Sequence, residues 1–147
     1  MVKMEDWELV YSLNRDGISM LSFFERCRHF RTTLLVIQDQ QGSVFGGFCT
    51  ETWKIHSSFY GTGENFLFTF KNGRDPTVFR WTGVDDQFQW ANDSSIGLGG
   101  GNRGRFGLFL KDNFYKGSSS KTSTFENEVL SKDADFVCAM LEVWGFD

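Results

Sequence analysis

Phe59-Tyr-Gly-Thr-Gly-Glu-Asn-Phe-Leu-Phe-Thr-Phe70 runs from a glycine turn directly into an apolar, aromatic strand. The turn carries one carboxylate, Glu64, and its glycines reach backbone conformations that other residues adopt only at a cost. Rings at every second position, Phe66, Phe68 and Phe70, are typical of a β-strand with these side chains on one face. No set of catalytic side chains accompanies the stretch, so it predicts a binding scaffold and not a recognisable enzyme.

The length and composition predict a single domain that spans residues 1–147. A chain of this size buries roughly 70% of its unfolded surface, which is enough for a hydrophobic core without disulfides or metal ions. Aromatic residues make up 17% of the chain and phenylalanine occurs 17 times, so large rings are expected to dominate that core. With one proline, the chain is expected to be ordered over most of its length.

The charge balance argues against a duplex nucleic acid as the partner. The formal net charge is −4 and the isoelectric point is about 5.2, whereas binding to phosphates requires clustered lysine and arginine. The densest basic group, Arg26, Arg28, His29 and Arg31, falls where a helix should end. Cations complement the partial negative charge at a helix C-terminus, which is the interpretation we favour over an anion site.

The three cysteines, Cys27, Cys49 and Cys138, are too few and too widely spaced for a zinc site. We expect each to be a buried, reduced thiol, which suits a reducing compartment. A redox-active thiol is the alternative, but no Cys-x-x-Cys pair supports it. The sequence therefore predicts neither a metal ion nor another cofactor.

The hydrophobic pattern predicts no membrane insertion, because no apolar run approaches the roughly 18–20 residues that cross a bilayer. The start, Met1–Trp7, lacks the apolar region of a signal peptide. We therefore expect a cytoplasmic protein, and we expect it to be a monomer.

The spacing of short strand-like segments, with few helices among them, predicts a sandwich of β-strands. Ser19 is expected to cap the main helix, with Leu21, Phe24 and Cys27 or Arg28 following at the spacing of one apolar helical face. Phe23 and Phe24 are expected to place their rings on the core face. Gly46 and Gly47 within one strand indicate a bulge or a close packing contact. The expected strands cover 32–38, 44–49, 65–70, 77–81, 87–90, 96–98, 106–110 and 136–144, with a strand or short helix at 7–13, a turn at 14–17 and loops at 56–64 and 117–124.

The glycine-rich stretch 97–104 resembles a phosphate-binding loop, with Arg103 and Arg105 beside it. A dinucleotide-binding loop leads from a strand into a helix, whereas strand-like sequence follows these glycines. We favour a connection between strands that needs positive φ angles. The stretch 117–122 lacks the glycine spacing of a Walker A loop and is rejected as a nucleotide site.

Glu51 and Glu64 are the best candidates for a pair of catalytic carboxylates, because both flank the same loop. Paired acids with different pKa values perform acid–base chemistry, and His56 could serve as a base beside them. The alternative that we favour is that each carboxylate accepts backbone hydrogen bonds and holds a turn. The five tryptophans are interpreted as core or core-rim residues, since only Arg80-Trp81 combines a ring with a cation as single-stranded nucleic acids require.

Taken together, these segments resemble the TLDc domain found in oxidation resistance proteins. Each motif alone is modest, but seven occur in the family's order and extend through almost the whole chain. Lys121-Thr-Ser123 stands where most members have a cysteine. The motifs are Trp7–Leu13 with Asp16–Ser19, Val44–Phe48, Phe59–Phe68, Phe79–Gly83, Gly97–Gly101 with Phe106–Leu108, Thr124–Asn127 with Leu130-Ser131, and Leu141–Phe146.

The resemblance implies a mostly β fold with flanking helices, arranged as a two-sheet antiparallel β-sandwich. It also implies protection against oxidative stress and, as in several relatives, binding to peripheral subunits of the vacuolar proton pump (V-ATPase). It also implies association with V-ATPase-bearing organelles or mitochondria. The family has no agreed catalytic mechanism, which agrees with the residues described above.

Two functions therefore stay open. The first is a non-enzymatic interaction module whose loops 54–64 and 97–104 face a large protein assembly. The second is an enzyme of peroxide or hydrolytic chemistry built on Glu51 and Glu64. The candidate binding residues are Glu51, Gly61, Gly63, Glu64, Gly99, Gly100 and Gly101.

Overall fold

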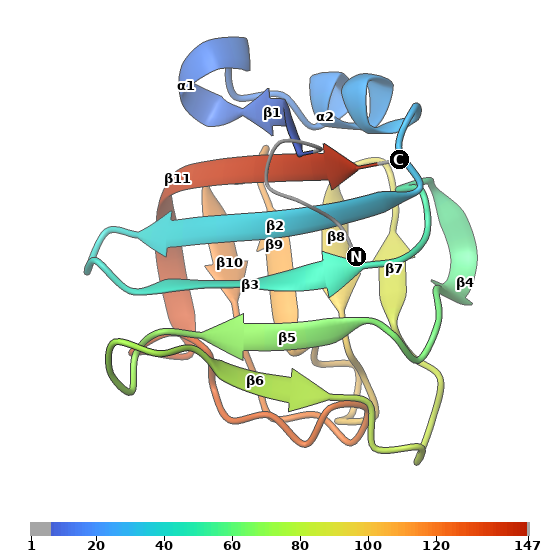
Figure 1. Ribbon diagram of the computed structural model, residues 1–147, viewed down its shortest axis with the longest axis vertical. Coiled ribbons are helices and arrows are strands. Elements are labelled where there is room, and N and C mark those ends of the chain that lie inside the picture. The colour runs from blue at the N-terminus through green and yellow to red at the C-terminus, as the bar shows by residue number, and fades with distance from the viewer. Residues whose placement is uncertain (1–6, 147) are drawn as a thin grey trace.

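The computed structural model describes residues 7–146, so most of the Met1–Trp7 start lies outside the described residues. The chain forms antiparallel strands with two short helices near its beginning (Figure 1). The elements are β1 (Glu8–Ser12), α1 (Leu13–Asp16), α2 (Met20–Cys27), β2 (Thr32–Asp39), β3 (Val44–Cys49), β4 (His56–Tyr60), β5 (Phe66–Thr69), β6 (Thr77–Arg80), β7 (Gln89–Ala91), β8 (Ser95–Leu98), β9 (Leu108–Lys111), β10 (Lys116–Ser118) and β11 (Asp135–Phe146).

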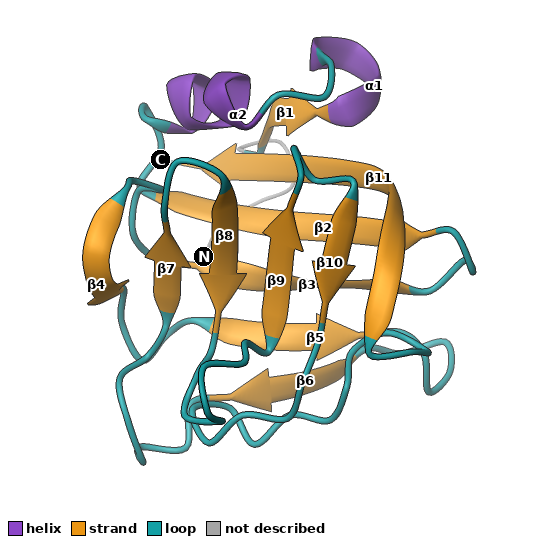
Figure 2. Cartoon of the chain, turned by 180° about the vertical axis from the view of Figure 1, so that it is seen from behind, coloured by secondary structure: helices purple, strands orange, loops and turns teal. Residues whose placement is uncertain are grey.

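The strands form two layers that share β11, and this confirms the predicted sandwich. The first layer holds β1, β11, β2, β3, β5 and β6, and the second holds β4, β7, β8, β9, β10 and the start of β11. Strand β11 pairs with β10 through residues 135–137 and with β2 through residues 138–146, with a register shift after Cys138. The strands of one layer cross those of the other, and α1 and α2 lie at one end (Figure 2).

The core lies between the layers and follows from the alternation of side chains along each strand. In β2 every second residue is buried, and Leu35 and Ile37 are completely enclosed. Leu108 and Leu110 of β9 and Leu141 of β11 point into the same space. Since each fully buried side chain of this size contributes about 1.5–3 kcal/mol, the core accounts for most of the stabilisation of the sandwich.

Helix α2 begins as predicted, because the Ser19 side chain accepts a hydrogen bond from the Ser22 amide. Its buried residues are Met20, Phe23 and Cys27, whereas Leu21 is 76% exposed. The expectation that Leu21 faces the core was therefore wrong. The helical face that meets the sandwich starts one residue earlier, at Met20.

One short segment near the helices differs from the prediction, and a second has an unusual backbone conformation. Residues 14–16 of the expected turn belong to helix α1, and Gly17, with a φ of 87°, caps the C-terminal end of this helix. The chain adopts left-handed φ angles of 52° at Asn113 and 71° at Phe114, although neither is glycine. Asn113 accepts a hydrogen bond from the Met20 amide at 3.0 Å, and the buried Phe114 ring packs on Phe23 at 5.2 Å. These contacts at the start of α2 hold the unusual conformation in place.

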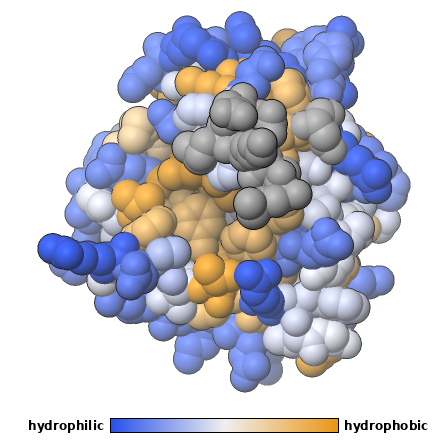
Figure 3. Space-filling view, viewed as in Figure 1, coloured by the Kyte–Doolittle hydropathy of each residue, from blue (hydrophilic) through white to orange (hydrophobic). Residues whose placement is uncertain are grey.

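The period-two pattern of β5 is confirmed, and it separates the strand into two different faces. Leu67 and Thr69 are fully buried in the core. Phe66 lies on the outer face, where it stacks on Phe48 of β3 with 5.0 Å between ring centroids. Apolar residues gather on this face of the first layer (Figure 3). Ring packing therefore covers the outside of the layer as well as its core side.

Strand β4 was not predicted, because residues 56–64 were expected to form a loop. Its residues 56–58, His-Ser-Ser, are exposed, and β4 pairs with β7 at only two positions, His56 with Ala91 and Tyr60 with Gln89. A short polar edge strand lacks the hydrophobic alternation that marks the other strands. The loop prediction was therefore wrong for residues 56–60.

Gly46 confirms the predicted close packing within β3, and no register shift marks a bulge there. A Cβ atom at Gly46 would lie 1.8 Å from the Leu35 carbonyl oxygen and 2.9 Å from the Phe68 ring. Only a glycine leaves room for the Leu35 carbonyl and the Phe68 ring at this position.

Gly46→Ala is expected to lower the free energy of unfolding by about 3 kcal/mol, because backbone and ring must both move to admit the methyl group. Urea denaturation followed by circular dichroism measures this change. Gly42→Ala is the control, because Gly42 has open space around it and a φ of 88°, so only about 1 kcal/mol of backbone strain is expected. Equal losses in the two variants would contradict this explanation.

Candidate functional site

Two buried amides bring Glu51 next to the glycine turn. Asn65 accepts a hydrogen bond from the Thr50 amide at 3.0 Å and donates one to Gln89 at 3.1 Å. Gln89 in turn donates to the Glu51 carbonyl at 3.0 Å. Asn65 is 1% exposed and Gln89 is completely buried. The end of β3, the start of β5 and β7 are thereby fixed to one another, close to Gly61.

Gly63 packs directly against the indole of Trp81, which follows β6. A Cβ atom at Gly63 would lie 2.2 Å from Cε3 of Trp81. The indole nitrogen donates a hydrogen bond to the Asp85 carbonyl at 2.6 Å, so the ring is held from two sides. Trp81 is nevertheless 44% exposed, whereas Trp53 is buried. The interpretation as core or core-rim residues therefore holds for both, because Trp81 packs on the buried Phe88 with 5.5 Å between ring centroids.

The loop that contains Gly99–Gly101 joins the same region through Asp85. The Asp85 carboxylate accepts hydrogen bonds from the hydroxyls of Ser123 and Thr124, and Thr124 also accepts one from the Gly100 amide at 3.0 Å. A Cβ atom at Gly101 would lie 1.8 Å from the Ser123 hydroxyl. Gly99 and Gly101 have φ angles of 78° and 85° between β8 and β9, which confirms the predicted strand connection.

These contacts bring the predicted segments 61–64 and 99–101 together with segment 81–87, which was not predicted to be part of the site. We call these three segments the glycine corner. Burial opposes ionisation of Asp85, but the hydrogen bonds from Ser123, Thr124 and the Gln87 amide outweigh it and lower the pKa of this carboxyl. An ionised Asp85 therefore connects two of the three segments of the glycine corner.

Glu51 and Glu64 occupy different surroundings. Glu64 is exposed and lines an open hollow of about 680 Å³. The Glu51 carboxylate is 3.9 Å from Arg31, which also lines the hollow, but Glu51 does not. His56 bonds through Nδ1 to Ser58 at 3.0 Å and packs on Tyr60. Among the described contacts of His56, none involves either glutamate.

All three cysteines are buried and unpaired, as predicted. Burial raises the pKa of Cys27 to about 12, and the pKa of Cys138 also to about 12. Burial raises the pKa of Cys49 as well. Since the thiolate is the reactive form, these thiols are poor nucleophiles at neutral pH.

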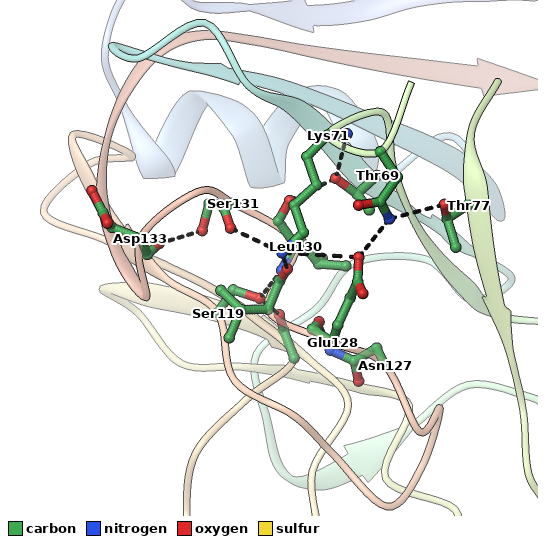
Figure 4. A network of polar contacts seen from close by, with 12 residues as sticks. Thr69, Lys71, Thr77, Ser119, Asn127, Glu128, Leu130, Ser131 and Asp133 are labelled. Carbon is green, nitrogen blue, oxygen red and sulfur yellow. Dashed lines mark hydrogen bonds and ion pairs between the residues drawn. The ribbon is translucent and has the colours of Figure 1, made fainter. Parts of the chain in front are cut away.

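The serine- and threonine-rich loop was predicted at 117–124, but residues 117 and 118 belong to strand β10. The irregular segment 119–131 that follows is largely buried and filled with hydrogen bonds (Figure 4). Thr69 of β5 donates to the Leu130 carbonyl at 2.6 Å, and the Leu130 amide donates to Ser119 at 2.9 Å. Lys71 donates to the carbonyls of Val129 and Ser131. This irregular segment is therefore tied to both layers of the sandwich.

Sequence reasoning missed four residues that build the site: Asn65, Trp81, Asp85 and Gln89. Two of the four could have been recognised in the sequence. Asn65 and Gln89 are polar amides within aromatic strand segments, and a polar group that is buried in such a strand requires hydrogen-bond partners.

Within residues 7–146, no group of three or more histidine, cysteine or acidic residues is placed to hold a metal ion. In the same part of the chain, neither helix has the length and apolar character needed to cross a bilayer.

The TLDc domain matches the chain over residues 1–147. The chain belongs to the TLDc domain family. It is 42% identical to human nuclear receptor coactivator 7 and 40% identical to oxidation resistance protein 1 of Xenopus laevis, over 96% of this chain in both cases. The human oxidation resistance protein 1 is 39% identical over the same share. The chain spans only about 15–16% of the length of these relatives.

Asp85→Asn is expected to lower the free energy of unfolding by about 1–2 kcal/mol at pH 7. A hydrogen bond to a charged group contributes about 1.5–3 kcal/mol, and solvent screens part of it at this partly exposed position. Because the folded pKa lies below the unfolded value of about 3.9, this stabilisation is present above that value and is lost as the pH falls through the folded pKa.

Urea denaturation of wild type and Asp85→Asn at pH 7 and at successively lower pH tests this expectation, and the difference between them should shrink in acid. Asp93→Asn, in the exposed turn between β7 and β8, is the matched control and should change little. A difference that stays constant down to pH 2 would contradict the assignment of an ionised Asp85.

The native TLDc domain is expected to react very slowly with Ellman's reagent at pH 7.4, because each thiol is buried and protonated. After unfolding in urea, Cys27, Cys49 and Cys138 should all react. Rapid labelling of any one of them in the native protein, detected by absorbance and located by peptide mass, would show that its thiol is accessible.

Proposed function

We propose that this TLDc domain is a non-enzymatic interaction module that contributes to resistance against oxidative stress by binding peripheral subunits of the V-ATPase. Membership of the family that includes oxidation resistance protein 1 supports the link to oxidative stress. The partner comes from the family resemblance. The observation that carries the proposal is the glycine corner, where a fixed and exposed indole lies among loops whose backbones are held by buried hydrogen bonds.

Rigid loops favour specific binding because little conformational entropy is lost when a partner docks. In the glycine corner, Gly63 and the Asp85 carbonyl hold Trp81, and the Asn65–Gln89 amides hold the neighbouring turn. Trp81 therefore combines large contact area with a fixed orientation, as hot-spot residues of protein interfaces do. These features support a protein partner at this corner.

The buried thiols support an indirect role in stress resistance. Direct scavenging of peroxide requires an accessible thiolate that is oxidised first to a sulfenic acid. Cys27 and Cys138 have pKa values raised to about 12, and all three cysteines are enclosed. Resistance that acts through a bound partner needs no such chemistry.

The enzyme alternative, with Glu51 and Glu64 as catalytic acids, stays a prediction. A purified chain is tested for peroxide consumption and for hydrolysis of model esters and peptides, alongside the Glu51→Gln/Glu64→Gln variant. We expect no turnover above the buffer rate for either protein. Turnover that disappears in the double variant would establish the enzyme and contradict the module.

The module is tested by retention of purified V-ATPase peripheral subunits on the immobilised chain. Gly63→Val should reduce retention at least about tenfold, because its side chain must displace Trp81, and a hot-spot contact is worth about 2 kcal/mol or more. Gly42→Val is the control, since it has the same type of change in open space on another turn. Circular dichroism confirms that each variant is folded. Equal retention by wild type and Gly63→Val, or no retention by wild type, would contradict the proposal.

A further inference from the structure

Of the two charged residues that line the hollow beside β5, Arg31 has an ion-pair partner and Glu64 has none among the described residues. Arg31 is paired with Glu51 at 3.9 Å. The guanidinium of Arg80 lies over the Phe66 ring at 5.4 Å from its centroid. Glu64 is exposed, and within residues 7–146 no cation lies within ion-pair distance of it. This leaves one carboxylate of the hollow available to a cation from outside.

The walls of the hollow are suited to the rest of a basic side chain. Trp81 and Phe48 provide aromatic surface, and Thr50 and Thr62 provide hydroxyl groups at the rim. Gly63 and the Asp85 carbonyl fix the indole, and Gly63 directly precedes Glu64 in the chain. A carboxylate and an indole that line one hollow are the two groups that bind an alkylammonium or guanidinium ion most favourably.

We propose that the hollow binds a lysine or arginine side chain of a partner protein. The charged end lies between the Glu64 carboxylate and the indole of Trp81, and the aliphatic stem lies along Phe48. The inference rests on the proposed function, because it names the chemistry of the partner that the glycine corner receives. It goes further in assigning Glu64 and Trp81 as the residues that select a basic side chain.

Arg31 is the one residue of the hollow that opposes this occupant. Its guanidinium would repel a second cation, but Glu51 compensates for its charge. Glu51→Gln should therefore weaken binding of a basic side chain, through an uncompensated Arg31. Glu64→Gln should weaken it more strongly, through loss of the direct partner.

The site is tested without any assumed protein partner by titrating the ¹⁵N-labelled chain with Nα-acetyl-lysine methylamide. Nα-acetyl-norleucine methylamide is the matched probe, since it keeps the aliphatic stem and lacks the ammonium group. We expect the lysine probe to shift the indole N–H signal of Trp81 and the amide signal of Glu64, and the norleucine probe to shift them much less. The norleucine probe giving equal shifts would overturn the assignment.

Glu64→Gln should weaken binding of the lysine probe about fivefold or more, as expected for loss of a partly exposed charged contact next to an aromatic face. Asp93→Asn, an exposed acidic residue in the turn between β7 and β8, is the control and should leave the affinity unchanged. Trp81→Leu is a second variant that removes the indole. Unchanged affinity in Glu64→Gln would overturn the proposal even if Trp81→Leu does not fold.

The pump-subunit retention assay separates this inference from the proposed function. If wild type binds the lysine probe through Glu64 but retains no V-ATPase subunit, the basic-side-chain site stands and the proposed partner is wrong. If wild type and Glu64→Gln retain the subunits equally well, the proposed function stands and Glu64 does not select a basic side chain. Retention that falls in Glu64→Gln together with probe binding supports both.

Discussion

Buried polar groups must be hydrogen-bonded, and the hydrogen bonds that satisfy them hold together the end of the sandwich at which the glycine corner lies. Segment 119–131 has no regular secondary structure, yet much of it is buried. Its backbone can lie inside the protein because Ser119 and Thr124 bond to neighbouring main chain, and Asn127 donates to the carbonyls of Ser120 and Glu128. A chain held by so many side-chain contacts has one conformation. The Asp85 carboxylate extends this order from Ser123 and Thr124 to the loop after β6.

Much of the fold could be predicted from the sequence, because hydrophobic alternation and turn chemistry are local signals. Strands β2 and β3 and the Ser19 cap are examples, since each depends on residues within a few positions. The errors have local causes too. β4 carries few apolar residues, and Leu21 was assigned to the core although the buried helical face starts at Met20. The position of the Phe66 ring outside the core depends on which face of β5 meets the second layer, and alternation alone does not determine this.

The candidate site was predicted in part. Glycine turns can be recognised in a sequence, because glycine is required where the φ angle is positive or where another group packs closely on the backbone. Gly63 and Gly101 both make close packing contacts of this kind. The side chains that these glycines meet, Trp81 and Ser123, are 18 and 22 residues away along the chain. No local pattern identifies such partners. The same limit applies to the Glu51 and Glu64 pair, since the ion pair between Glu51 and Arg31 depends on how the end of β3 is placed.

The main consequence of the glycine turn for function is that Gly63 supports the indole ring of Trp81. A thiol with a pKa of about 12 is ionised to roughly one part in 10⁵ at pH 7, so the cysteines contribute little reactivity. Surface recognition, in contrast, depends on side chains whose orientation is set before a partner arrives. The absence of a side chain at Gly63 lets Trp81 lie against the backbone, and the Asp85 carbonyl fixes the direction of its indole. A larger residue at this position would displace the indole from its place in the hollow that Glu64 also lines, so the same glycine that shapes the turn also sets the position of the aromatic wall of this hollow.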